Sequence, residues 1–285
     1  MANIDLNISP YFDDFDENKD FLRVLFRPGF PVQARELTTA SSILQEQIKR
    51  TGDFLLKDGA RVTGAKIQFD KKAKRVTLTG SSNTSFPSSA ARASSILSNI
   101  QDLENLVITN DEGTVKAVVM SSPTGTNKIT SVGNLYLKYI SSTVFDPAGG
   151  YIYATLADNP SQTAELYNTF SATSECSLAH IEEGVYYVQG FFTRVKQQTV
   201  VVDNSSKSPN VKLGFTVSET LVTPNTDTSL FDNARGSSNE GAPGAHRLQQ
   251  SLAFGIRSLS ADTDPNFFEV MNIQNGISIQ QTSTT

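Results

Sequence analysis

The sequence predicts an α+β protein that is predominantly antiparallel β, with one long N-terminal helix and a β-rich inserted module. One segment near the N-terminus has apolar residues at helical spacing. After it, apolar and polar residues alternate in short runs that are separated by turn residues. No helical pattern alternates with these runs, as a parallel α/β fold would require. The charged fraction is only 19%, so much of the surface is expected to be neutral and polar.

Residues 1–36 are predicted to form an extended docking arm. The arm carries an acidic cluster. A calcium-binding loop would place oxygen ligands at alternating positions around a glycine turn, but here Phe15 interrupts the acidic residues and no glycine follows them. A solvated acidic segment is therefore expected, and its candidate partner contacts are Asp13, Asp14, Phe15 and Asp16. In the apolar run "FLRVLFRPGFPV", Val24–Phe26 suit a strand and Pro28–Gly29 suit the centre of a type II turn.

The next module, residues 37–79, is predicted to be the helix plus a β-hairpin. Pro31 hinders helix formation until about Ala34, and Asp58–Gly59 indicate the helix end. One apolar stripe runs along the helix, formed by Leu37, Leu44, Ile48 and Leu55. The stripe can pack on the chain's own sheet or form a seam between copies of the chain, and two heptads do not decide between these.

The remainder is predicted to be β. The runs "ARVTGAKIQF" and "RVTLTG" flank the polar turn "DKKAK" and predict a hairpin. A Ser-rich linker at 80–95 opens a β-rich inserted module that extends to residue 180. Residues 181–285 form a second β-rich module, in which 229–247 are expected to be an ordered structural loop.

The sequence offers little for catalysis or for cofactors. It has one cysteine and two distant histidines, so it predicts neither a disulfide nor a metal site within the chain, and Cys176 is expected to be a small buried or half-buried residue. No phosphate-binding glycine loop and no G-x-S-x-G motif occurs. The net charge of −5 argues against a nucleic-acid or anionic-membrane binder. The acidic N-terminus and the lack of a long apolar run predict neither Sec-type export nor a membrane helix.

Four segments resemble a virion domain of unknown function from tailed phages, notably T4-like myoviruses and cyanophages. They are "PYFDDFDENKDFLRVLFRPGFPVQAREL", "ILQEQIKRTGDFLLKDG", "IEEGVYYVQGFF" and "SLFDNARGSSNEGAPGAHRL". The resemblance runs in order from about residue 10 to 275 and is weakest at 80–175. It implies a baseplate or tail-fibre-associated structural protein, found in the virion tail after synthesis in the host cytoplasm.

The sequence therefore leaves two functions as alternatives. The first is a non-enzymatic structural protein that connects or anchors a tail fibre to the baseplate, with other tail proteins as partners. The second is a carbohydrate-binding or depolymerising tailspike component. Tyrosine and phenylalanine are plentiful, but the chain has no tryptophan for stacking on sugars. A homo-oligomer is expected, a trimer first and a dimer second, since the stripe can pack against copies of itself.

Overall fold

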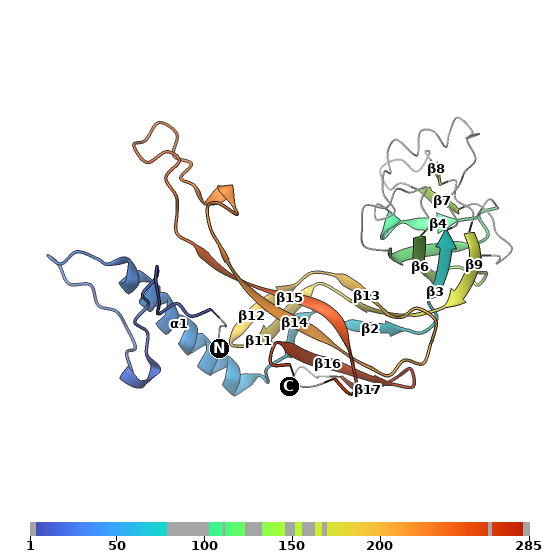
Figure 1. Cartoon of the computed structure of the whole chain (residues 1–285), viewed down its shortest axis with the longest axis horizontal. Coiled ribbons are helices and arrows are strands. Elements are labelled where there is room, and N and C mark those ends of the chain that lie inside the picture. Colours follow the sequence, from blue (N-terminus) through green and yellow to red (C-terminus); the bar gives the residue numbers. More distant parts are fainter. Residues whose placement is uncertain are drawn as a thin grey trace.

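The computed structural model describes residues 4–78, 103–110, 112–122, 133–145, 152–155, 163–166, 170–261 and 264–281. The predicted Ser-rich linker at 80–95 lies outside them. Figure 1 shows an elongated molecule with the helix at one end, a smaller β module at the other, and long strands between. The predicted fold class is confirmed: one α-helix precedes several antiparallel sheets in this part of the chain.

Helix α1 spans Ala34–Leu55 and confirms the predicted helix. It opens with a capping box, in which the backbone N–H of Gln33 donates to the Glu36 carboxylate at 2.9 Å. It ends before Gly59, whose φ of 83° suits a residue without a side chain.

The arm that precedes α1 was predicted correctly at its turn and wrongly at its strand. Gly29 has a φ of 86°, and the backbone N–H of Phe30 donates to the Arg27 carbonyl at 3.2 Å, as in a type II turn. Val24–Phe26, predicted as a strand, have no regular structure. Alternation of side chains suits a strand, but a strand also needs a ladder partner, and the described residues supply none.

The body begins with two adjoining three-stranded antiparallel sheets. Each of three chain segments supplies one strand to the first sheet and another strand to the second, with a bend between the two strands. The strands are β1 (Ala60–Gly64) and β2 (Ile67–Asp70), β11 (Gly184–Val188) and β10 (Ser177–Ile181), and β12 (Phe191–Val195) and β13 (Gln198–Asp203). The sheet orders are β1-β11-β12 and β13-β10-β2.

A four-stranded antiparallel sheet completes the body. Its order is β15-β14-β16-β17, from β14 (Val211–Val222), β15 (Arg247–Ser258), β16 (Phe267–Gln274) and β17 (Ile277–Gln281). Buried side chains from this sheet and the two smaller sheets form one core, which includes Phe215, Phe254, Tyr186 and Ile181. Beyond Thr216, β14 pairs only with β15, so the two strands continue as a ribbon that projects from the body (Figure 1).

The second module is a seven-stranded antiparallel sheet with its own core. Its order is β8-β7-β4-β5-β6-β3-β9, from β3 (Lys74–Leu78), β4 (Val107–Thr109), β5 (Lys116–Ser121), β6 (Gly133–Tyr139), β7 (Ile152–Thr155), β8 (Thr163–Leu166) and β9 (Phe170–Glu175). The core includes Val76, Ile108, Leu137 and Phe145.

The predicted hairpin across "DKKAK" is wrong. Strand β2 pairs with β10 in the body, whereas β3 pairs with β6 and β9 in the second module. The turn is thus a crossing between two sheets. Alternation reveals that a segment is a strand, but its partners lie about a hundred residues away in sequence and cannot be read locally. A small cluster of Ala73, Tyr136, Cys176 and Leu178 packs at this crossing and buries Cys176, as expected.

Candidate docking surface

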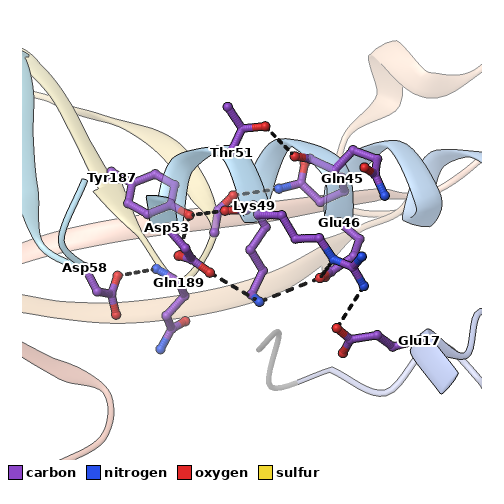
Figure 2. A network of polar contacts seen from close by, with 12 residues as sticks. Glu17, Gln45, Glu46, Lys49, Thr51, Asp53, Asp58, Tyr187 and Gln189 are labelled. Atoms are coloured by element: carbon purple, nitrogen blue, oxygen red, sulfur yellow. Dashed lines mark hydrogen bonds and ion pairs between the residues drawn. The ribbon is translucent and has the colours of Figure 1, made fainter. Parts of the chain in front are cut away.

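Helix α1 is held against the body by the hairpin between β11 and β12. The Tyr187 hydroxyl lies 2.9 Å from the Lys49 carbonyl oxygen and 2.7 Å from Asp53 Oδ1 (Figure 2). Gln45 Nε2 donates to the Gly190 carbonyl at 2.8 Å. The Tyr187 ring fits here because position 52 is a glycine, buried against it. These contacts fix one side of α1 to the sheet.

The electrostatics of this contact favour a charged Asp53 and a neutral Tyr187. The hydrogen bond from Tyr187 lowers the pKa of Asp53, and the nearby Lys49 ammonium lowers it further. Burial raises the pKa of Tyr187, and the Asp53 carboxylate raises it again. Asp58 accepts from the Gln189 backbone N–H at 2.7 Å, yet burial raises its pKa overall.

The N-terminal arm is attached to a different side of the helix. The Asp13 carboxylate accepts from the hydroxyls of Thr39, at 2.8 Å, and Ser42. Asp14 also accepts from Thr39, at 2.7 Å. Glu17, labelled in Figure 2, forms an ion pair with Arg50 at 2.9 Å. The helix therefore lies between its own arm and the sheet.

These contacts correct the expectation of a solvated acidic cluster. Asp13 is only 4% exposed, because its carboxylate binds two helix hydroxyls. Asp16 caps the short 3-10 helix η1 (Glu17–Lys19) by accepting from the Asn18 backbone N–H. Phe15 is half-buried and Asp14 is exposed. Of the predicted contact residues, Asp13 and Asp14 thus fasten the arm to its own helix, and Asp13 is the buried one among the four.

The predicted stripe lies on the remaining side of the helix and faces solvent. Its residues are spaced so that they lie within roughly 40° of one another around a helix of 3.6 residues per turn. Each keeps about half or more of its surface exposed: Leu37 57%, Leu44 64%, Ile48 47% and Leu55 64%. The helix buries Thr39, Ile43 and Gly52 instead. Of the two alternatives open from sequence, packing on the chain's own sheet does not occur in this structure.

The outer part of the arm, residues 20–33, carries a second set of exposed apolar side chains. They are Phe21, Leu22, Leu25, Phe26, Phe30 and Val32, each more than half exposed. Figure 1 shows this part of the arm projecting away from the body beside the start of α1. Arg27 lies over the Phe30 ring, 4.9 Å from its centroid. The sequence predicted a strand at Val24–Phe26 and a turn at Pro28–Gly29, but not that this run forms an exposed surface.

An open groove of about 660 Å³ adjoins the stripe. Helix α1 lines it with Gln45 and Ile48, strand β12 with Phe191–Arg194, and the ribbon with residues of β14 and β15. The apolar lining comprises Ile48, Phe191, Phe192, Val222, Leu230 and Leu248. No sequence pattern could reveal this groove, because its walls come from three distant parts of the chain.

The ribbon tip at 229–247 is an ordered, exposed loop, as the sequence predicted. The backbone N–H groups of Asp232 and Gly241 bond across the loop, and Gly236 and Gly241 take positive φ. At its base, Tyr11 Oη lies 2.6 Å from His246 Nδ1, so the loop also touches the N-terminal arm.

Other kinds of site find no support in the part of the chain that the structure describes. No group of three or more His, Cys, Asp or Glu is placed to hold a metal ion there. Within the same residues, no helix has the length and apolar character needed to cross a bilayer. His180 bonds Thr199 in the sheet and is remote in sequence from His246.

Comparison with known proteins places the chain in a family. No curated protein and no solved structure matches it. A family model, Domain of unknown function (DUF4815), matches residues 9–82 and 168–285. The match covers the arm, α1 and the body sheets, and it omits most of the seven-stranded module. Since the matched residues make up most of the chain, the protein belongs to the DUF4815 family.

Proposed function

We propose that this protein is a structural component of a phage tail, one that connects or anchors a tail fibre to the baseplate without catalysis. The observation that supports it best is the apolar surface on the arm and α1 of a chain whose cores are otherwise packed. The phage assignment itself depends on the resemblance of the N-terminal, helical and loop segments to tailed-phage virion domains.

The size of the apolar surface favours assembly with other chains. Aromatic side chains carry ~150–250 Å² each and aliphatic ones somewhat less, so the six on the arm and the four on the stripe, about half to three-quarters exposed, together present on the order of 1,000 Å² on two sides of the helix. The largest apolar patch of an ordinary monomer is about 300–600 Å². A standard interface buries about 800 Å² on each partner. We infer that the arm and α1 are covered in the working assembly.

The way the surface is displayed also fits a connector. Hydrogen bonds fix α1 to the sheet on one side and to the arm on another, so the stripe is held in a defined position before any partner binds. Preorganisation of this kind lowers the entropy cost of association. A homo-oligomer, a trimer first and a dimer second, can form through the stripe, and other tail proteins can bind the remaining apolar surface.

Particle localisation tests the proposal. Antibodies against the purified protein, applied to particles of the phage that encodes it, should label the tail end in electron micrographs. Detection in infected-cell lysate but never in purified particles would overturn the proposal. A reducing-sugar assay on host polysaccharide supplies the second test: no turnover is expected, and turnover would instead support the tailspike alternative.

A further inference from the structure

We propose that Phe21–Phe26, the part of the outer arm (residues 20–33) that precedes its turn, lies in the groove of a second copy as an added β-strand. This inference rests on the proposed role in assembly and names how two copies are joined. The groove presents strand edges that are unpaired among the described residues, and the arm is an extended apolar segment that has no ladder partner among them.

Strand β15 offers a free edge to the groove. Gln198 bonds this edge further along, donating to the Leu252 carbonyl and accepting from the Phe254 backbone N–H. Backbone groups of alternate residues in a strand point to the same edge. The regular β14–β15 register therefore directs the backbone groups of Leu248 and Gln250 outward too. Both residues line the groove.

Strand β12 offers the second free edge. Gln189 and Gly190 both have positive φ, so they form a type I′ turn in which Val188 and Phe191 are the closing hydrogen-bonded pair. The backbone groups of Phe192 and Arg194 then point away from β11, and both residues line the groove. At the groove wall, Gln250 Nε2 is buried without a hydrogen-bond partner among the described residues.

The arm has an apolar face and backbone groups that are complementary to the groove. In an extended conformation, Leu22, Val24 and Phe26 lie on one face of the arm and are all apolar. That face suits the apolar lining of the groove, and the arm backbone can supply donors and acceptors to the free strand edges. Exposed strand edges are known templates for a strand from another chain.

The occupant is assigned to a second copy for two reasons. The outer arm is tied to its own helix at both ends, by the Glu17–Arg50 ion pair and by the capping box at Gln33, and it points away from the body (Figure 1). The apolar area of arm and stripe suffices for a stable interface on the scale given above.

Two matched pairs of variants test the arm and the groove edge in the purified full-length protein. Leu22→Asp with Phe26→Asp should leave the melting temperature unchanged, since both side chains are more than half exposed. The same double variant should raise the dissociation constant (Kd) of self-association about a hundredfold or more. Ile277→Asp with Ile279→Asp, equally exposed on β17, should leave Kd unchanged. Leu248→Pro removes an outward N–H, so the chain should fold but not associate, whereas Gln249→Pro removes a bond to β14 and should lower the melting temperature.

Photo-crosslinking then identifies the contact. With p-benzoylphenylalanine at position 26, an equal mixture of ¹⁵N-labelled and unlabelled chains should give mixed-isotope adducts on residues 191–194 or 247–250. The same group at position 277 should give none there. Each of three results would overturn the proposal that the arm of one copy binds the groove of another. They are a wild-type protein that stays monomeric at micromolar concentration, adducts confined to one chain, and an arm variant with wild-type Kd. None of these results bears on where the protein lies in the particle, so the two proposals can fail separately.

Discussion

The ring of Tyr187 lies against Gly52 so closely that a β-carbon at position 52 would be 2.4 Å from Cε2 of the ring. Glycine inside a helix usually costs about 1 kcal/mol relative to alanine. Here we expect the opposite sign: Gly52→Ala should destabilise the protein by about 1–3 kcal/mol in urea unfolding, because it displaces the tyrosine that fixes α1.

Two controls isolate this contact. Thr51→Ala, at the neighbouring exposed position, should have little effect or a slightly stabilising one. In a Tyr187→Ala background, Gly52→Ala should no longer destabilise. If the alanine costs the same with and without the ring, the helix is not packed against Tyr187 as described.

Asp13 should control the attachment of the arm. Asp13→Ala removes the acceptor of the Ser42 hydroxyl and one of the acceptors of the Thr39 hydroxyl, and we expect a loss of about 1–3 kcal/mol at this contact. Hydrogen–deuterium exchange should rise in residues 4–17. Asp14→Ala is the control, since its exposed carboxylate should matter less. Equal exchange in both variants would contradict the role of the buried carboxylate.

The Asp53–Tyr187 hydrogen bond should make stability depend on acid pH. The pKa of Asp53 is lowered from its ordinary 3.8 in the folded chain, so its contribution is present above that value and is lost as pH falls through the folded pKa. Wild type should therefore exceed Asp53→Asn in stability at neutral pH, and the two should converge in acid. The effect is small, because half of the side chain is exposed.

Comparison of urea midpoints across pH measures this difference. Asp20→Asn, on the exposed arm, serves as the matched control and should follow wild type at every pH. A gap between wild type and Asp53→Asn that widens in acid would have the wrong sign for a lowered pKa.

Cys176 should report the junction between the body and the seven-stranded module. Burial raises the pKa of its thiol to about 12, and the nearby Asp70 carboxylate adds to the rise. Because the thiolate is the reactive form, labelling by a disulfide reagent at pH 8 should be slow in the folded protein and fast in urea. Leu178→Ala should accelerate labelling, because removing this buried side chain lowers the free energy of unfolding by about 2–5 kcal/mol and so exposes Cys176 more often. Rapid labelling of the wild type would show that the junction is open.

Local patterns in the sequence predicted much of the fold. The helix boundaries follow from Pro31 and Gly59, the arm turn follows from Pro28–Gly29, and "VKLGFTVSETLV" coincides with strand β14. These features depend on neighbouring residues alone. The hairpin across Lys71–Lys72 was mispredicted because strand pairing depends on partners far away in sequence.

The candidate docking surface was predictable only in part. The stripe was visible from its spacing, but its exposure depends on the helix being held elsewhere, at Gly52 by Tyr187 and at Thr39 by Asp13. The burial of Asp13 depends on hydroxyls 26 and 29 residues away. The groove requires β12 and β15 to meet, which no local pattern specifies.

The mass and stability of one double variant test the central claim, that the stripe on α1 is a surface for other chains and not part of the core. Leu44→Asp with Ile48→Asp should keep the wild-type circular dichroism spectrum and melting temperature, because both side chains are exposed, and should lower the mass in analytical ultracentrifugation. Ile43→Asp, one position away but 3% exposed, should unfold or strongly destabilise the chain. A double variant that unfolds, or one that folds and keeps the mass of the wild type, would contradict the claim.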